Sequence, residues 1–209
     1  MTKVSLIRHG LVHNPGGVYY GRLPGFGLAE LGRAQAAAAG DYLADAGVVA
    51  VYHSPMLRAF QTAEIVRARC APDAPLVECD FLNEIHSRFD GLAATEMEKR
   101  GWNFYDEVTP PYEQPIDIVT RLLKFFDLAR QEHPGRHVVG VSHADPIAFA
   151  LLWAGDLPLS ADQRKRLIDC GIAEPYPSPA SVTTFEFADS DERKLLAFRY
   201  HAPAADLRE

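Results

Sequence analysis

The chain has 209 residues, of which 47% are hydrophobic and 23% charged, and its formal net charge is −7. This composition is typical of soluble globular proteins, and the length fits one domain, so we expect a single domain over residues 1–209. The negative charge and the absence of a basic run argue against a nucleic-acid partner. No apolar run is long enough for a bilayer, and no signal peptide is apparent at the N-terminus. Because its three cysteines are widely spaced and expected to be reduced, we predict a cytoplasmic protein without a membrane partner.

The first half of the chain alternates predicted strands and helices. In chain order, its pattern predicts a strand at 3–8, a helix at 28–46, a strand at 48–53, a helix from Ser54 to about Cys70 and a short strand at 76–81. Glycine is favoured at helix ends, so Gly47 is expected to end the first helix. Ser54 and Pro55 are typical of the N-cap and the first position of the second helix. A strand, a helix and a strand in this order imply a right-handed parallel unit.

The second half continues this alternation after an irregular segment at 91–115. The pattern predicts a helix at 116–132, a strand at 137–142, a helix from Asp145, and a terminal hairpin of strands at 181–187 and 194–200. The run at 137–142 is almost continuously apolar, as expected in the middle of a parallel sheet. The expected fold is therefore an α/β three-layer sandwich around a central, mostly parallel sheet.

Two histidines and two arginines lie at the predicted strand ends. Arg8 and His9 end the first strand, and His143 follows the strand at 137–142. Arg58 falls in the first turn of its helix, where a cation opposes the helix dipole and a bound anion would explain its presence. Ligands of open α/β sheets bind beyond the carboxyl ends of the strands. Since arginine matches phosphate oxygens and histidine is a nucleophile near neutral pH, the sequence predicts chemistry on a phosphate.

Four segments of the chain form a set of motifs: Arg8-His9-Gly10, LAELGRAQA at 28–36, SPMLRAFQTA at 54–63 and Val141-Ser142-His143. In sequence and in order, these segments resemble the signature segments of the histidine phosphatase superfamily. The loop at 13–26 is similar to that of a phosphatase-type bacterial branch. The resemblance covers roughly residues 3–155 and implies a phosphoglycerate mutase-like fold.

The resemblance also implies roles for individual residues. His9 would accept the phosphoryl group, and the oxygens of that group would be bound by Arg8, Arg58, His143 and Asn14. Guanidinium groups can meet the charge of the transferred group, so we expect neither a metal ion nor another cofactor. The resemblance assigns the proton donor to Glu84, while Asp90 and His86 remain alternatives because they are close in sequence.

Further residues are expected at the border of the substrate. Gly21 and Arg22 lie in the loop beside it, where Arg22 either binds a second anionic group or is a solvated loop residue. Ala144 and Asp145 stand where the family commonly has two glycines, and Asp145 is expected to cap its helix. The aromatic residues of the irregular segment either line the pocket mouth or pack in the core, and core packing is favoured. They are Trp102, Phe104 and Tyr105.

The leading hypothesis is a metal-independent phosphomonoester hydrolase that acts on a small phosphorylated metabolite through phospho-His9. The alternatives are a phosphoglycerate mutase and a catalytically silent relative that binds a phosphorylated ligand or a protein. The segment between Glu84 and residue 116 lacks a paired arginine clamp, and Leu11 stands where mutases often have glutamate, which both weaken the mutase alternative. The spacing of the other histidines does not indicate a zinc site. The physiological substrate and the oligomeric state stay open.

Overall fold

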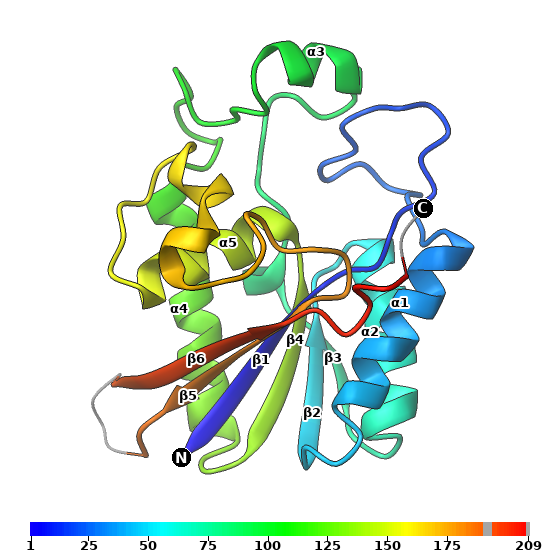
Figure 1. Cartoon of the computed structure of the whole chain (residues 1–209), viewed down its shortest axis with the longest axis vertical. Helices are drawn as coiled ribbons and strands as arrows, with labels where there is room; N and C mark the ends of the chain where they lie inside the picture. Colours follow the sequence, from blue (N-terminus) through cyan, green and yellow to red (C-terminus); the bar gives the residue numbers. More distant parts are fainter. Residues whose placement is uncertain (190–193, 208–209) are drawn as a thin grey trace.

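The computed structural model describes residues 1–189 and 194–207. Figure 1 shows a central sheet between two layers of helices. The six strands are β1 (Thr2–Arg8), β2 (Val48–His53), β3 (Leu76–Glu78), β4 (His137–Ser142), β5 (Val182–Phe187) and β6 (Leu195–His201), in the sheet order β3-β2-β4-β1-β5-β6. The strands from β3 to β1 pair in parallel, and the hairpin of β5 and β6 continues the sheet antiparallel. The predicted mostly parallel α/β sandwich is confirmed.

The helices cover both faces of the sheet and one of its ends. They are α1 (Glu30–Tyr42), α2 (Leu57–Cys70), α3 (Ala94–Lys99), α4 (Pro115–Glu132) and α5 (Ala144–Ala154), with short 3-10 turns η1 (Asp80–Leu82), η2 (Gln163–Lys165) and η3 (Leu167–Cys170). In Figure 1, α1 and α2 lie on one side of the sheet and α4 and α5 on the other, while α3 lies beyond the carboxyl ends of the parallel strands. Among the described residues, no helix combines the length and apolar character needed to cross a bilayer.

Neighbouring residues of β1 pack into two different cores, because successive side chains of a strand point to opposite faces. Leu6 belongs to the larger core, which includes the aromatic side chains of α4 and α5. Ile7 belongs to the smaller core, where Ala39 of α1 and Ala63 of α2 pack. Burial on both faces explains why all six residues of β4 are buried and why its sequence is nearly continuously apolar.

The boundaries of two predicted elements differ from the structure. Helix α1 ends at Tyr42 rather than at residue 46, and a series of turns leads to Gly47, whose φ of +67° suits glycine. Strand β3 ends at Glu78, and residues 80–82 form a 3-10 turn instead of continuing the strand. Both differences concern element ends, where local turn hydrogen bonds compete with the regular pattern.

The two predicted helix caps were wrong. Helix α2 begins at Leu57, so Ser54 precedes its N-cap, although Arg58 does lie in its first turn as expected. Helix α5 begins at Ala144, which makes Asp145 a residue of its first turn and not its cap. Both Ser54 and Asp145 are engaged in buried tertiary contacts beside the cavity described below. The hydroxyl of Ser54 also accepts the main-chain N–H of Met56 (3.3 Å), just before the helix begins.

Candidate active site

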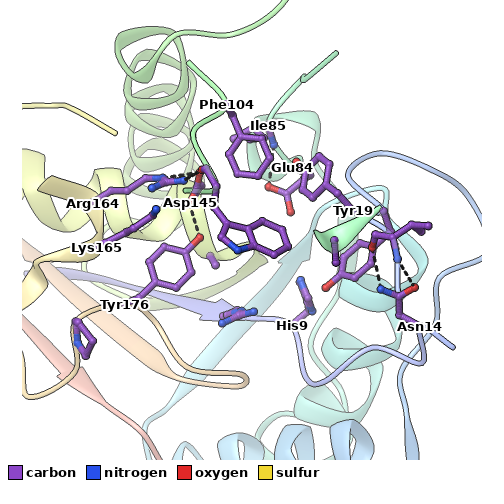
Figure 2. A pocket seen from close by; sticks show the side chains of 17 residues that line it. His9, Asn14, Tyr19, Glu84, Ile85, Phe104, Asp145, Arg164, Lys165 and Tyr176 are labelled. Carbon is purple, nitrogen blue, oxygen red and sulfur yellow. Dashed lines mark hydrogen bonds and ion pairs between the residues drawn. The ribbon is translucent and has the colours of Figure 1, made fainter. Parts of the chain in front are cut away.

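The carboxyl ends of β1 and β4 border a cavity of about 490 Å³. Figure 2 shows that side chains from distant parts of the chain surround it, including His9, Glu84, Asp145 and Tyr176. Of the predicted site residues, those that line it are Arg8, His9, Asn14, Glu84 and Ala144. Arg58 and His143 are fully buried and contact the lining residues directly. The structure therefore brings together all five residues that were predicted to be catalytic.

The backbone after His9 is held by the motif residues of the neighbouring helices. The main-chain N–H of Gly10 donates to Thr62 of α2 (3.1 Å), and that of Leu11 donates to Gln35 of α1 (2.9 Å). A Cβ on Gly10 would lie 2.2 Å from the carbonyl oxygen of Gly32, so only glycine allows α1 to approach this closely. These contacts fix the position of the His9 side chain relative to the sheet.

His9 is a buried, neutral imidazole whose Nε2 accepts a hydrogen bond from Nε of Arg58. Its Nδ1 lies 2.8 Å from the carbonyl oxygen of Gly10, which can only accept, so the ring proton is on Nδ1. Burial lowers the pKa of His9 well below its usual value, and the charges of Arg58 and Arg8 lower it further. Nε2 is therefore the unprotonated nitrogen, which is the state that a nucleophile requires.

Arg58 connects the other polar residues of the site. Its Nε lies 3.3 Å from Nε2 of His9, and its Nη2 donates to the carbonyl oxygen of Gly21 (2.7 Å). The same Nη2 lies 3.2 Å from Nδ1 of His143 and 3.4 Å from Oε2 of Glu84. Its Nη1 and the Nε of Arg8 are buried and have no hydrogen-bond partner among residues 1–189 and 194–207. Two unsatisfied guanidinium nitrogens next to His9 suit a phosphate group as their partner.

Glu84 lies between Arg58 and the cavity. Its Oε1 accepts the main-chain N–H of Ile85 (2.9 Å), and its Oε2 lies 3.3 Å from Nδ1 of His143. Burial raises the pKa of Glu84, while the charge of Arg58 opposes the shift only in part. A carboxyl group that holds its proton more strongly than usual is suited to donate that proton to a leaving group.

The two alternative proton donors are placed elsewhere. Asp90 does not line the cavity, and its Oδ2 accepts the main-chain N–H of Arg22 (3.0 Å). The Nδ1 of His86 is hydrogen-bonded to the carbonyl oxygen of Pro111 (3.0 Å), also outside the cavity lining. The geometry therefore favours Glu84 over Asp90 and His86 as the proton donor.

His143 is oriented by a residue that sequence reasoning treated only as a helix cap. Its Nε2 lies 2.8 Å from Oγ of Ser54, and its ring centroid lies 5.2 Å from that of His9. Burial and the nearby charge of Arg58 lower the pKa of His143 well below its usual value. When the Ser54 hydroxyl donates to Nε2, the ring carries its proton on Nδ1, on the side of Glu84 and Arg58. The position of Ser54 directly after β2 was the signal for this role.

Gly21 and Arg22 do not line the cavity in which they were expected. The carbonyl oxygen of Gly21 accepts from Arg58, so this residue positions a site side chain. The guanidinium of Arg22 donates to the main-chain oxygen of Glu84 (2.8 Å) and to Glu113 (3.1 Å). Asn14 does line the cavity, and its amide pairs with the main chain of Val18. Arg22 thus supports the backbone of Glu84 from outside the cavity.

The cluster of His9, Glu84 and His143 also has the geometry of a metal site, because one potential ligand atom of each residue lies within 4.8 Å of the others. The guanidinium of Arg58, however, lies within 3.4 Å of all three side chains. A permanent positive charge among the ligand atoms repels a metal cation and attracts an anion. The donor set is therefore better suited to a phosphate than to a metal.

A second buried ion pair forms the far wall of the cavity. Nε of Arg164 lies 2.9 Å from Oδ2 of Asp145, which also accepts the hydroxyl of Tyr105 (2.5 Å). The hydroxyl of Tyr176 donates to Oδ1 of Asp145. Arg164 and Tyr176 lie in the part of the chain beyond residue 155, where the motifs gave no signal for site residues.

Two aromatic residues for which core packing was favoured do pack there and also line the cavity. Phe104 belongs to the larger core and Trp102 packs against it, while both contribute to the cavity wall. Tyr105 belongs to the same core and contacts Asp145 without lining the cavity. Tyr19 and Tyr20, which sequence reasoning did not single out, also line it. The guanidinium of Arg58 lies 4.7 Å from the ring centroid of Tyr20, a cation–π contact.

Comparisons with known proteins identify the family of this chain. The family model of the histidine phosphatase superfamily (branch 1) matches residues 4–195. Over 98% of both chains, the protein is 38% identical to Uncharacterized protein Rv0525 of Mycobacterium tuberculosis. It is 31% identical to Phosphoserine phosphatase 1 of Hydrogenobacter thermophilus, over 70% of this chain and 73% of that one.

Solved structures show the same fold. Bacillus stearothermophilus YhfR superposes with a TM-score of 0.75 at 25% identity, over 93% of this chain and 94% of that chain. The mycobacterial glucosyl-3-phosphoglycerate phosphatase Rv2419c gives a TM-score of 0.72 at 22% identity, over 96% and 97% of the two chains, and supports the fold alone. The family match, the relatives and the strand-end cluster around His9 lead to one conclusion: this chain belongs to the histidine phosphatase superfamily and is a phosphatase.

Proposed function

We propose that this protein is a metal-independent phosphomonoester hydrolase that acts on a small phosphorylated metabolite through a phosphohistidine at His9. The observation that carries the proposal is the His9 imidazole, whose Nδ1 is bonded to the Gly10 carbonyl and whose unprotonated Nε2 faces the guanidinium of Arg58. Such a ring nitrogen is ready to attack phosphorus without prior deprotonation.

The phosphoryl group would bind between the two arginines. The unpartnered nitrogens of Arg8 and Arg58 supply charged donors for its oxygens, and His143, whose ring centroid lies 5.2 Å from that of His9, adds a third donor. Charge-assisted hydrogen bonds in a buried site stabilise the charge that spreads over the phosphoryl oxygens during transfer. Asn14 lines the same cavity, and its amide nitrogen, which donates to the carbonyl oxygen of Val18, has a second hydrogen to offer.

Glu84 would act as the proton donor in the first step and as the proton acceptor in the second. In the first step, Nε2 of His9 forms a bond to phosphorus while the bond to the ester oxygen breaks, and the carboxyl of Glu84 gives its proton to the departing alkoxide. In the second step, the carboxylate of Glu84 takes a proton from water, and that water attacks phosphorus. The bond between phosphorus and Nε2 then breaks, so inorganic phosphate and neutral His9 are regenerated.

A p-nitrophenyl phosphate assay in the presence of EDTA tests this function. We expect turnover that EDTA does not reduce, because Arg58 occupies the place among the site side chains that a metal ion would need. Loss of all activity with EDTA and its recovery with a divalent metal would overturn the metal-independent mechanism. Absence of turnover at every pH between about 4 and 9 would favour a silent, ligand-binding relative instead.

The mutase alternative is tested with 3-phosphoglycerate in the presence of 2,3-bisphosphoglycerate. A mutase must hold the second charged group of a sugar acid while the phosphohistidine waits. Arg22, and Arg88 and Arg100 of the segment between Glu84 and residue 116, have other contacts: Arg22 pairs with Glu113, and the guanidinium groups of Arg88 and Arg100 lie over the ring of Phe89. We therefore expect release of inorganic phosphate to outrun isomerisation, and the reverse ratio would overturn the hydrolase assignment.

A further inference from the structure

The part of the cavity that would hold the leaving group is walled by aromatic side chains. Tyr19, Trp102, Phe104 and Tyr176 line it, together with the small side chains of Ala94 and Ala144. Figure 2 places Tyr19, Phe104 and Tyr176 around the space beyond His9 and Glu84. Aromatic and apolar walls of this kind bury flat, apolar groups well.

Trp102 has an unusual backbone at the position where it lines this space. Its φ is +55°, in the left-handed region that residues other than glycine rarely adopt. Such a conformation persists only when the surrounding structure enforces it, and these residues cluster at binding sites. Here the carbonyl oxygen of Trp102 accepts a hydrogen bond from Nη2 of Arg164, which holds the backbone in place.

Arg164 is itself fixed by the buried cluster around Asp145. Asp145 accepts from Arg164, Tyr105 and Tyr176, and the carbonyl of Ala161 accepts from Nη1 of Arg164 (2.7 Å). The cluster joins the segment after α3, the start of α5, the turn η2 and the loop before β5. Because Asp145 is two residues from His143, the aromatic wall is held at a fixed place relative to the proposed phosphate site.

Most polar groups of this wall have partners within it. Arg164 and Asp145 neutralise each other, and the ammonium of Lys165 keeps its charge while it donates to the carbonyl of Gly101. The buried hydroxyl of Tyr19 has no partner within the described ranges and could bond one polar substituent. A sugar or sugar acid carries several hydroxyl or carboxylate groups, and burying them here without partners would be costly.

We infer that the leaving group of the physiological substrate is an apolar alcohol that carries a planar ring, and that Trp102 is the residue that selects it. The inference rests on the proposed function, because it places the phosphate of the same molecule at His9. Its test, however, uses binding as well as turnover, so that the two proposals can fail separately.

Non-hydrolysable phosphonates measure the preference without chemistry. We expect benzylphosphonate to bind at least about tenfold more tightly than ethylphosphonate, from ring burial and stacking. In the Trp102→Ala variant, the ratio of the affinities for benzylphosphonate and ethylphosphonate should fall close to one. Trp153→Ala is the matched control, because the chain has two tryptophans and Trp153 packs beside Phe126, outside the cavity lining. Benzyl phosphate and ethyl phosphate, whose alcohols have similar acidity, should show the same ratio in kcat/KM.

Tryptophan fluorescence supplies a readout that does not depend on the alanine variant being folded. In Trp153→Phe the one remaining tryptophan is Trp102, and 4-nitrobenzylphosphonate should quench its emission with saturation. In Trp102→Phe the same ligand should leave the emission of Trp153 almost unchanged. Quenching of Trp153 alone would overturn the assignment of Trp102.

Equal affinities for benzyl- and ethylphosphonate, or tighter binding of 3-phosphoglycerate than of benzylphosphonate, would overturn the inference even if p-nitrophenyl phosphate is hydrolysed. Conversely, a ring preference with saturable quenching but no turnover of any ester would retain the inference about the pocket and reject the hydrolase function.

Discussion

The Nε of Arg58 faces the Nε2 of His9 across 3.3 Å, so a permanent cation lies beside the ring nitrogen that carries no proton. This contact has two consequences. The positive charge adds to the effect of burial in keeping the imidazole neutral. The same guanidinium also places a hydrogen-bond donor for a phosphate group next to the proposed nucleophile. Replacement of His9 is therefore expected to abolish turnover, whereas replacement of Arg58 is expected to weaken the binding of phosphate.

Replacement of His9 by alanine should abolish turnover, because no other unprotonated ring nitrogen is placed beside both arginines. Phosphodonor labelling that is acid-labile and alkali-stable should occur in the wild type and vanish in the variant. His53→Ala is the control: His53 ends β2 and has the same Nδ1 contact with the next carbonyl (2.8 Å), but it lies outside the cavity lining. Labelling that disappears in His53→Ala and persists in His9→Ala would contradict the assignment.

Glu84→Gln should cost at least about a hundredfold in kcat for esters of poorly acidic alcohols, whose alkoxides need a proton to depart. The loss should be much smaller with p-nitrophenyl phosphate, because nitrophenolate leaves without one. Asp90→Asn, which removes the charge of the alternative donor, should not lower kcat for either substrate by a comparable factor. Equal losses for both substrates in Glu84→Gln would show that another group supplies the proton.

Arg58→Gln should weaken vanadate binding by about one to two orders of magnitude, the value of a charge-assisted hydrogen bond in a buried site. Arg69→Gln removes a cation from the same helix at an exposed pair with Asp41 and should leave vanadate affinity unchanged. Isothermal titration with folded variants provides the measurement. An unchanged affinity in Arg58→Gln would place the phosphate away from this guanidinium.

The buried histidines predict how stability depends on pH. His9 and His143 have pKa values held well below normal by burial, so in the folded protein they stay neutral where the unfolded chain takes up protons. The free energy of unfolding should therefore fall as pH drops below about 6.5, by at most about 1.4 kcal/mol per pH unit for each histidine. Urea denaturation between about pH 5 and 8 should show a smaller slope in His143→Gln. A slope as steep as in the wild type would mean that His143 is protonated in the fold.

The pair of Asp145 and Arg164 should behave as a buried ion pair. Asp145→Leu should destabilise the fold by about 3–5 kcal/mol, because it leaves the guanidinium buried without a counter-charge. The double variant Asp145→Leu/Arg164→Met should recover part of that loss in urea denaturation. Breaking the exposed pair of Asp41 and Arg69 should cost no more than about 1 kcal/mol. Additive losses in the double variant would contradict the pairing.

The sequence by itself determined the sheet and the residues of the proposed phosphate site. Apolar strands, helical spacing and strand-end motifs are local signals, and the rule that parallel strands present their carboxyl ends at one edge is enough to gather Arg8, His9, Arg58 and His143. Glu84 was assigned by resemblance, and its place beside Arg58 and the cavity now supports that assignment over Asp90 and His86.

Only the tertiary structure decided the part of the cavity that we propose for the leaving group. Arg164 and Tyr176 line the cavity from a segment without motifs. Asp145, which was expected to cap its helix, instead pairs with Arg164, 19 residues away in sequence. Arg22 was expected at the substrate and instead supports the backbone of Glu84. Such partners are chosen by burial, since a buried charge must find a counter-charge wherever the fold brings one near, and no short-range sequence pattern records that choice.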